Sequence, residues 1–361
     1  MARAAGVAAG AAAAAAAGAL GEDTQYKLDS LQSKFGDLQE SMLLTRVHTE
    51  MADVETALSL LPTEIEKVRT RGYVFRSFLE NKVEVLSEQW DEMKDNVAQE
   101  VERRTRDLEG DSDAAERALN QALGGGSAQI TRAEHAIESL ESKVYAAQSA
   151  VEAMYEPLQQ NVNQARSQVA EITKLLDAVD AASFELHPVE DVVAFCEAQY
   201  LEREDEGPEG LLYLTDERLL FERKEQVATK KVLFITTQKE TVQELVFEVP
   251  VRQIEEIKAT DEKKFLKRHE ILELFFAPEA DLPGATLRLI HTKNEEWSQL
   301  IGRVKSGEID KERTQPKDEE AIEAVRAAPT KCPTCGATLS VEIVRGMQEI
   351  ECEYCGSVIR L

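Results

Sequence analysis

Four of the five cysteines in this 361-residue chain form two CxxC pairs near its carboxyl end, Cys332 with Cys335 and Cys352 with Cys355. A CxxC turn directs two sulfurs at one point in space, and two such pairs at this separation have the spacing of metal ligands. Four thiolates would fill every position around one Zn2+, so no open position would remain for water or substrate. The pattern therefore predicts a structural zinc ion. Iron in the same site, or two disulfides in a secreted module, are the alternatives.

Short elements around the cysteines must bring the four sulfurs together. Gly336 and Gly356 follow the second cysteine of each pair and can take the positive φ that closes such a turn. The alternating runs 339–344 and 347–351 predict two short strands joined by a turn at 345–346. A module of this length has too little core to fold alone, so metal binding should supply most of its folding free energy, about 10–16 kcal/mol.

The segment 328–361, with its motifs CPTCG and CEYCG, resembles a zinc ribbon with rubredoxin-type knuckles. The resemblance implies a small zinc-ribbon β-module. Acidic residues outnumber basic ones in the ribbon, and the ribbon lacks an aromatic platform on which bases could stack. Nucleic acid is therefore an unfavoured partner for this module.

The composition of the whole chain points the same way. Its formal net charge is −26, which repels phosphates and argues against a protein that binds nucleic acid through its backbone. A thiolate site plus one lone cysteine, Cys196, indicates a reducing compartment, and we expect a cytoplasmic protein. We interpret Cys196 as a small buried apolar residue. Apart from the alanine- and glycine-rich residues 1–21, no segment approaches eighteen successive apolar residues, so no transmembrane helix is predicted.

Residues 1–21 are almost all alanine and glycine after Arg3. Alanine is too weakly hydrophobic for this segment to span a bilayer, and the composition predicts a disordered tail. A poor signal peptide is the alternative, since a basic residue precedes a run of small residues.

Residues 22–183 carry apolar residues at steps of three and four, which is the spacing of a coiled coil. The longest stripe comprises Ile137, Leu140, Val144, Ala147, Val151, Met154, Leu158, Val162, Ala165, Val169, Ile172, Leu176 and Val179. We expect long antiparallel helices, with the helix from 128 to 182 folded back on the helix before a glycine hinge. The arm 22–61 either adds a third helix or pairs with a second protomer.

Three interruptions of these helices are expected. Pro62 removes a helix donor, and a capping box that begins at Thr63 would restart the helix. Gly110 and its polar neighbours form the second interruption. The third, at 124–127, is the strongest because three successive glycines do not hold a helix. Pro157 should kink the last helix without ending it.

The pattern changes to short β-rich runs between about 187 and 307. The expected strands are 192–200, 210–216, 218–221, 232–237, 245–249, 254–259, 271–276 and 285–291. A capping box at Thr292 and Glu295 precedes an expected helix over 295–305. These short strands and one closing helix predict a small β-barrel or sandwich capped by that helix.

Three segments of this region are similar to a GRAM domain, a member of the PH-like superfamily. They are GLLYLTDERLLF at 210–221, VFEVPVRQIEEIK at 246–258 and NEEWSQLI at 294–301. The resemblance implies a PH-like β-barrel with a C-terminal capping helix. It also implies a module that docks lipid or protein and does not catalyse a reaction.

Three basic clusters could bind phosphate or a membrane surface. They are Arg223, Lys224, Lys230 and Lys231; Lys263, Lys264, Lys267 and Arg268; and Lys67, Arg69, Arg71 and Arg76, which lie beside Tyr73, Phe75 and Phe78. The region 187–307 nevertheless counts 17 basic and 25 acidic side chains, a net charge of −8 that repels an anionic membrane. The third cluster is either an interfacial patch or a solvated face over a core stripe.

The sequence thus predicts a multidomain α+β protein. Its expected parts are the tail 1–21, the coiled coil 22–183, the PH-like domain 187–307, a charged linker 308–327 and the zinc ribbon 328–361. The composition of the linker favours a mobile tether.

No phosphate-binding loop, metalloprotease motif or nucleophile elbow occurs, and the five histidines are scattered, so no catalytic residue is expected. We therefore predict a non-catalytic scaffold or adaptor that binds zinc, docks protein partners and forms a homo-oligomer or a spacer through its coiled coil. One alternative is a peripheral membrane protein that binds acidic lipids. The other is a zinc-ribbon factor associated with nucleic acid.

Overall fold

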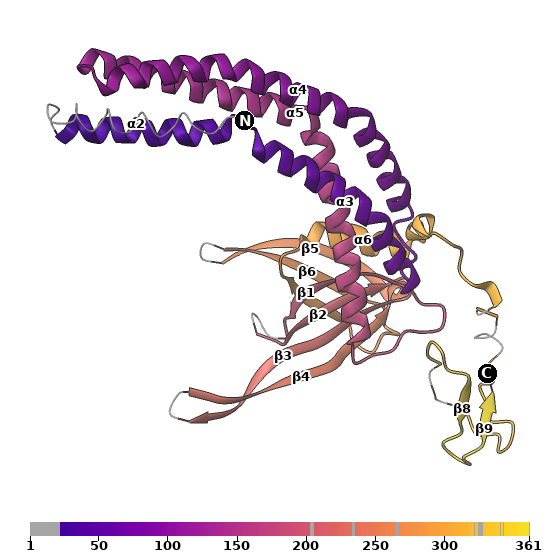
Figure 1. Cartoon of the computed structure of the whole chain (residues 1–361). Helices are drawn as coiled ribbons and strands as arrows, with labels where there is room; N and C mark the ends of the chain where they lie inside the picture. Colours follow the sequence, from indigo (N-terminus) through magenta and orange to yellow (C-terminus); the bar gives the residue numbers. More distant parts are fainter. Residues whose placement is uncertain are drawn as a thin grey trace. The chain divides into compact units, whose positions relative to one another are not determined.

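The computed structural model describes residues 22–202, 206–232, 235–264, 267–320, 322–323, 328–339, 341 and 343–360. The expected tail, 1–21, lies outside these described residues. Long helices and an antiparallel sheet make up most of the described chain (Figure 1). The chain divides into two compact units, Met1–Pro62 with Asn81–Ser167, and Thr63–Glu80 with Gln168–Leu361.

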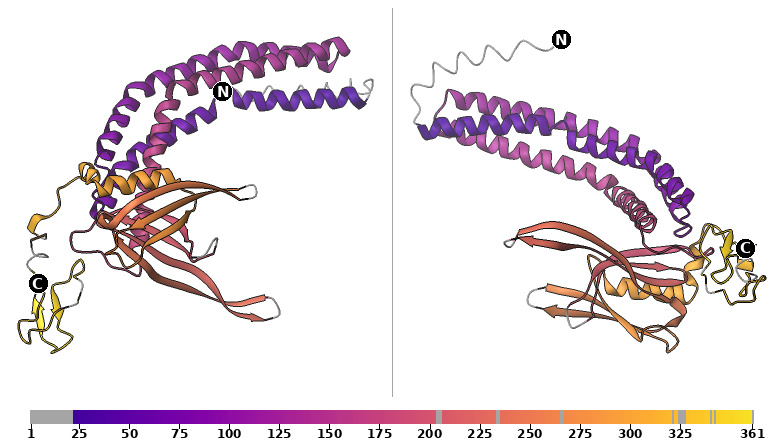
Figure 2. Two further views of the ribbon diagram at one scale, coloured as in Figure 1. Left: turned by 180° about the vertical axis from the view of Figure 1, so that it is seen from behind. Right: turned by 90° about the horizontal axis from the view of Figure 1, so that it is seen from below.

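Four long helices contribute to the first unit. They are α2 (Glu22–Ser41), α3 (Thr45–Thr70), α4 (Leu79–Leu123) and α5 (Ser127–Asp180). Within this unit α4 and α5 run side by side, as both views of Figure 2 show. The core joins residues of α2 and the turn after it with residues of α4 and α5: Phe35, Leu38, Met42, Leu108, Ala115, Leu119, Ile137, Leu140, Val144 and Ala147. The first part of the N-terminal arm therefore packs as a third helix.

The longest apolar stripe is buried almost throughout, with one change of register. Val151 and Leu158 are buried as expected, but Met154 is 36% exposed and Tyr155 is fully buried in its place. An α-helix has 3.6 residues per turn, so a heptad stripe drifts around it, and a neighbouring residue takes over the inward position. The Tyr155 hydroxyl donates to Glu50 Oε2 at 2.6 Å, which satisfies its polar end.

Two of the three expected interruptions are wrong. Helix α3 continues through Pro62, and helix α4 continues through Gly110. Buried residues flank both positions on the core side, Leu61 and Ile65 around Pro62 and Leu108 near Gly110. Burying such side chains contributes about 1.5–3 kcal/mol each, which offsets the roughly 1–3 kcal/mol cost of an internal glycine or proline. The third interruption coincides with the gap between α4 and α5 at 124–126.

The chain leaves helical geometry at two further places. Leu44 has φ 50° between α2 and α3, where the apolar stripe also skips. Gly72 has φ 94° after α3, and Tyr73 N–H donates to Val68 O at 3.1 Å while Gly72 N–H donates to Arg69 O at 2.9 Å. This pair of bonds is the Schellman motif, which requires a left-handed residue and favours glycine. Gly72 is therefore the signal for the end of α3.

The second unit contains a seven-stranded antiparallel sheet and a helix that follows it. The strands are β1 (Val192–Tyr200), β2 (Glu209–Thr215), β3 (Arg218–Val232), β4 (Ile235–Pro250), β5 (Ile254–Lys264), β6 (Lys267–Phe276) and β7 (Gly284–Leu289). Their order in the sheet is β4-β3-β2-β1-β7-β6-β5. Helix α6 spans Asn294–Lys305. This arrangement is compatible with a PH-like fold.

The sheet differs from the expected closed barrel. Strands β4 and β5 are its two edges and do not pair with each other among the described residues. They are separated by Pro250 and a 3-10 turn, Val251–Gln253, after which β5 pairs with β6. The expected strand 232–237 is also wrong as a separate element. It spans the end of β3 and the start of β4, where Val232 pairs with Ile235.

The core of the sheet is aromatic, and α6 covers part of it. Phe221 is fully buried and stacks on Phe247 with ring centroids 5.9 Å apart. Trp297 and Ile301 of α6 are buried. The expected capping box at Thr292 is wrong. The N-cap of α6 is Lys293, and its side chain makes no capping hydrogen bond. The buried Asn294 instead donates to Thr260 O at 2.7 Å and Ile271 O at 3.0 Å, which ties the start of the helix to β5 and β6.

The first half of the expected linker is anchored to this unit. A 3-10 helix, Glu308–Glu312, precedes Arg313, whose side chain is only 5% exposed. Arg313 pairs with Asp191 at 2.7 Å and with Asp216, and its guanidinium lies 4.7 Å from the centroid of the Phe75 ring. The expected mobile tether is therefore wrong for the segment up to Arg313, because buried carboxylates bind its charged side chain.

Candidate metal centre

The two CxxC motifs form two matching turns. In the first, Gly336 N–H donates to Cys332 O at 2.8 Å, and Gly336 has φ 74°. In the second, Gly356 N–H donates to Cys352 O at 2.8 Å, and Gly356 has φ 70°. Only glycine adopts this left-handed conformation readily, which explains its position directly after each second cysteine.

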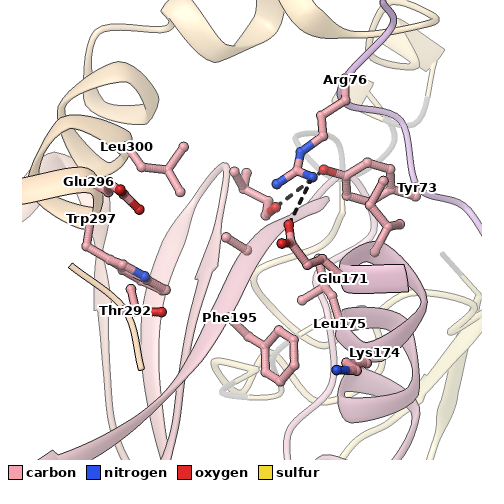
Figure 3. A pocket seen from close by; sticks show the side chains of 13 residues that line it. Tyr73, Arg76, Glu171, Lys174, Leu175, Phe195, Thr292, Glu296, Trp297 and Leu300 are labelled. Atoms are coloured by element: carbon pink, nitrogen blue, oxygen red, sulfur yellow. Dashed lines mark hydrogen bonds and ion pairs between the residues drawn. The ribbon is translucent and has the colours of Figure 1, made fainter. Parts of the chain in front are cut away.

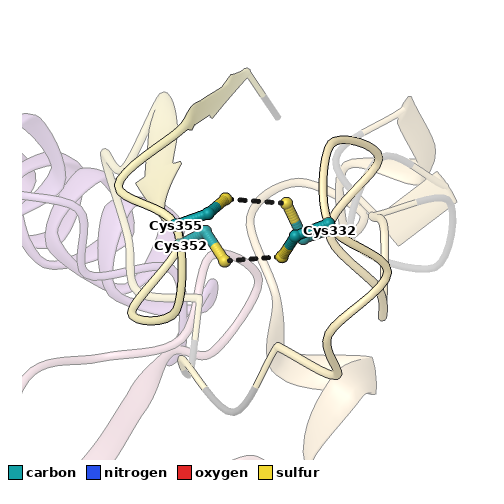
Figure 4. Close-up of side chains that lie close together, drawn as sticks. Cys332, Cys352 and Cys355 are labelled. Carbon is teal, nitrogen blue, oxygen red and sulfur yellow. Dashed lines mark hydrogen bonds between the residues drawn. The ribbon is translucent and has the colours of Figure 1, made fainter.

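The two turns bring the four cysteine sulfurs together (Figure 4). All four sulfurs lie within 4.8 Å of one another. The distances from Cys332 Sγ to Cys355 Sγ and from Cys335 Sγ to Cys352 Sγ are both 3.7 Å. A regular tetrahedron with Zn–S bonds of about 2.3 Å has sulfur–sulfur distances of about 3.8 Å, whereas a disulfide bond is about 2.05 Å long. The arrangement therefore fits a tetrahedral metal ion, and all four cysteines are free.

The burial of the sulfurs differs between the first and second cysteine of each pair. Cys332 and Cys352 are buried, at 2% and 1% exposed, and they cluster with Ile359 and the partly buried Leu339. Cys335 and Cys355 lie in exposed residues at the turns. Cys332 and Cys352 thus belong to the small apolar core of the module, and Cys335 and Cys355 face its surface.

A serine that the sequence analysis did not identify completes the sulfur cluster. Ser357 Oγ lies 3.3 Å from Cys332 Sγ and 3.1 Å from Cys355 Sγ. Hydrogen bonding to this hydroxyl, followed by backbone N–H bonds, lowers the pKa of Cys332 to about 5 and also lowers the pKa of Cys355. Ser357 directly follows the motif CEYCG, whereas Ala337 follows the motif CPTCG. This hydroxyl beside the second motif was the signal available in the sequence.

Close packing of the sulfurs raises the pKa of Cys335. Although the Ala337 backbone N–H acts to lower it, the neighbouring cysteine sulfurs raise the pKa of Cys335 to about 12. Like charges at these distances disfavour full ionisation of the group. A bound cation would remove this conflict, because a metal ion deprotonates the thiols that coordinate it. The four cysteines could therefore bind a metal ion.

The strands of the module differ from those expected. Strand β8 (Glu349–Glu351) pairs with β9 (Val358–Arg360), which lies after the second CxxC motif. The expected first strand, 339–344, is not a strand at its described positions. The turn at 345–346 is present, since Gly346 has φ 85° and Met347 N–H donates to Val344 O at 3.1 Å. Pairing β8 with β9 places the buried Ile350 and Ile359 opposite each other.

The fifth cysteine lies in a different environment. Cys196 is 6% exposed in β1, and burial raises the pKa of its thiol. A protonated thiol without access to solvent is a poor nucleophile. The interpretation of Cys196 as a small buried residue is therefore confirmed.

The arginines of the expected basic clusters bind carboxylates within the chain. Arg223 pairs with Glu225 and with Glu244, the latter at 3.2 Å, and Arg268 pairs with Asp261. The side chains of Lys230, Lys231, Lys263, Lys264 and Lys267 lie outside the described residues. In the third cluster, Arg69 pairs with Glu80 at 2.7 Å, and Arg71 pairs with Asp177 at 2.9 Å and Asp180 at 2.8 Å. Tyr73 and Phe75 are buried, so the third cluster is not a free interfacial patch.

Among the described residues, none of the helices combines the length and the apolar character that crossing a membrane requires.

No protein-family model matches the chain, and no curated protein is significantly similar to it. Solved structures with some similarity contain PH domains. One is the Vps36 N-terminal PH domain, which is 14% identical with a TM-score of 0.22. The match extends over 34% of this chain and 92% of the Vps36 chain. Another comprises the DH/PH domains of p115-RhoGEF, which are 14% identical with a TM-score of 0.23. The match extends over 81% of this chain and 98% of the p115-RhoGEF chain.

A third is the DH/PH fragment of PDZRHOGEF, solved in complex with human RhoA, which is 9% identical with a TM-score of 0.26. The match extends over 80% of this chain and 96% of the matched chain in that structure. All three TM-scores are low. The PH-like description of the sheet therefore rests on its own strand order and on the helix that follows it.

Proposed function

We propose that this chain is a non-catalytic adaptor whose carboxyl-terminal module is folded around a structural Zn2+ and docks a protein partner. The observation that carries the proposal is the arrangement of the four sulfurs, with 3.7 Å between Cys332 and Cys355 and between Cys335 and Cys352. Thiolates favour soft or borderline ions, and zinc is the common ion in four-thiolate structural sites. Four protein ligands leave no coordination position for a substrate, so the ion would serve folding.

The outer surface of the module supports a docking role. Tyr354, between the two cysteines of the second motif, is 73% exposed, and Val358 of β9 is 58% exposed. Their neighbours Ile350 and Ile359 face the small core, so the module has one apolar face turned inward and two apolar side chains turned outward. Exposed aromatic side chains are enriched where proteins bind one another. We propose that Tyr354 and Val358 contact the partner.

The sheet of the second unit supports the same role in a more general way. Its strand order and following helix are compatible with a PH-like docking module, and the GRAM assignment remains part of this proposal. Lipid binding is the less supported alternative because Arg223 and Arg268 already pair with carboxylates. Weak or no sedimentation of the chain with anionic vesicles at low salt is the expected result.

Metal analysis of the purified full chain tests the metal part of the proposal. One zinc ion per chain is the expected result, with loss of zinc in Cys352→Ser and retention in Cys196→Ala, which removes the one cysteine outside the site. Replacement by Co2+ should give the visible absorption of a tetrahedral thiolate complex. Purified protein without zinc, or with iron in its place, would show that the proposal is wrong.

Capture experiments test the adaptor part separately. Proteins that bind the wild-type chain specifically should be lost with Tyr354→Ala/Val358→Ala while zinc content stays unchanged. Tyr145→Ala is the matched control, since Tyr145 is 71% exposed on helix α5. An identical set of captured proteins for all three chains would contradict the proposed docking face.

A further inference from the structure

A cavity and a cluster of carboxylates lie in the second unit apart from the cysteines. The cavity, of 310 Å3, is lined by α5, the segment after α3, β1 and α6, with Trp297 on the side across from Arg76 (Figure 3). Its lining carries the cations Arg76 and Lys174 and the carboxylates Glu171 and Glu296, and Arg76 pairs with Glu171 at 3.4 Å. These charges balance within the chain, so the cavity favours no charged ligand.

The carboxylate cluster lies where β1 begins and β2 ends. Asp191 directly precedes β1, and Asp216 directly follows β2. Asp191 N–H donates to Asp216 Oδ1 at 2.8 Å, and Asp216 N–H donates to Asp191 O at 3.0 Å. Two cations from the segment after α6 bind the cluster, Arg313 at Asp191 Oδ2 and Lys317 at Asp216 Oδ2, both at 2.7 Å. The cluster therefore holds the segment that leads to the cysteine module.

A third cation reaches the same cluster from the module itself. Arg345 Nη2 pairs with Asp191 Oδ1 at 2.9 Å, the carboxylate oxygen that Arg313 leaves open. The guanidinium of Arg345 also donates to Glu190 O. The backbone N–H of Arg345 donates to Leu186 O at 2.8 Å. One residue of the module thus contacts three successive acceptors in the segment before β1.

Arg345 lies in the loop whose two ends the cysteines hold. The loop runs from Cys335 to Cys352, and the sulfurs of these two residues are 3.7 Å apart. Gly346, with φ 85°, forms the turn that presents Arg345. Holding both ends of a loop removes conformational freedom from the residues between them. A metal ion bound by the four cysteines would therefore favour the turn geometry that Arg345 needs to reach Asp191.

The contact is weak enough to open. The side chain of Arg345 is 43% exposed, and an ion pair with that much access to water contributes little between separate molecules. Within the chain, only the segment 318–331 separates the bound Lys317 from Cys332. A short tether gives an effective concentration of about millimolar, so a weak contact can still keep the turn in place.

We infer that the turn 344–347 is a latch that closes on Asp191 when the cysteine module has bound its metal ion. This inference rests on the metal site proposed above and links it to the sheet. Metal binding and docking of the turn favour each other, and such a coupling raises both affinities by the same factor. Loss of the ion opens the latch and frees the module from the sheet.

The first test measures the zinc affinity of the full chain in competition with a chelating indicator. Arg345→Ala should weaken zinc binding about tenfold, since hydrogen bonds to a charged group at the lower end of their range contribute about this factor. Arg345→Lys keeps the charge but lacks the planar fork that reaches two acceptors, so its affinity should lie between the two. Arg360→Ala is the matched control, an exposed arginine of β9 in the same module, and should stay within twofold of wild type.

Hydrogen exchange of the zinc-loaded chain tests the docking directly. Amides of 344–347 should exchange about tenfold faster in Arg345→Ala, while β8 and β9 keep their protection because the module stays folded. Unchanged zinc affinity or unchanged exchange at 344–347 in this variant would overturn the latch alone. A wild-type chain that binds no zinc would overturn the proposed metal site together with the latch, so the two failures are distinguishable.

Discussion

The cysteine module, 328–361, and the seven-stranded sheet differ in what stabilises them. The sheet has a core of large apolar side chains, such as the fully buried Phe221 and Tyr213. The buried residues of the module that its described part contains are Cys332, Ile350, Cys352 and Ile359, so half of them are candidate metal ligands. The sheet is therefore stabilised mainly by burial of its own side chains, whereas we expect the proposed ion to supply most of the folding free energy of the module.

Removal of the metal should have the largest effect and should be confined to the module. Chelation of zinc, or Cys352→Ser, removes about 10–16 kcal/mol of metal-binding free energy and should unfold 328–361. Hydrogen exchange followed by mass spectrometry should show loss of amide protection at β8 and β9 with β1–β7 unchanged. Protection of β8 amides in metal-free protein would contradict this contrast between module and sheet, because the module would then be stable without an ion.

Truncation of the sheet core should produce the converse result. Phe221→Ala should lower the free energy of unfolding of the second unit by about 3–5 kcal/mol, through lost burial and the cavity left behind. Urea denaturation measures this loss, and the zinc content of the folded protein should not change. Phe275→Ala is the control, since Phe275 is 40% exposed and its removal should cost far less. A similar loss for both variants would show that the buried stack is not the main source of stability.

The ion pairs of Arg313 should matter less than the aromatic core but more than surface pairs. Arg313→Ala leaves Asp191 and Asp216 without this partner, at 15% and 2% side-chain exposure. Breaking such a pair should cost about 3 kcal/mol, because the remaining charges stay desolvated. Limited proteolysis should then cleave the segment 308–317 first. Unchanged resistance to protease would contradict its anchoring by Arg313.

The smallest expected effect depends on pH. Burial raises the pKa of Asp216 above its ordinary value of 3.8, and Lys317, at 2.7 Å, opposes the rise. A raised pKa means that the folded state binds this proton more tightly than the unfolded state, so the charged carboxylate costs stability above that pKa. Lys317→Ala should therefore lower stability by about 0.5–1 kcal/mol at pH 7.

As the pH falls through the raised pKa of Asp216, its carboxyl becomes neutral and no longer needs a cation. The difference in unfolding free energy between wild type and Lys317→Ala should shrink toward zero in this window. Urea denaturation at a series of pH values measures it, and Lys311→Ala at an exposed position should show no such dependence. A difference that stays constant with pH would exclude Asp216 as the responsible group.

Local patterns predicted the elements better than their ends. The stripe through Ile137 and Val169 identified buried positions correctly because helical periodicity depends only on neighbours along the chain. Pro62 and Gly110 were wrong as helix ends because their cost is local, whereas the burial that offsets it depends on packing partners. The pairing of β8 with β9 was missed for a similar reason, since strand order is not contained in alternation.

By itself the sequence determined the four metal-ligand candidates, the long apolar stripes and the β-rich region, because each depends on residue type and spacing within one segment. Only the tertiary structure decided which segments meet. It brought Ser357 to the sulfurs, Arg313 to Asp191 and Asp216, and Arg76 to the same cavity as Trp297. These contacts join residues that can lie far apart in the chain, and their free energy arises from desolvation and geometry that exist only after folding.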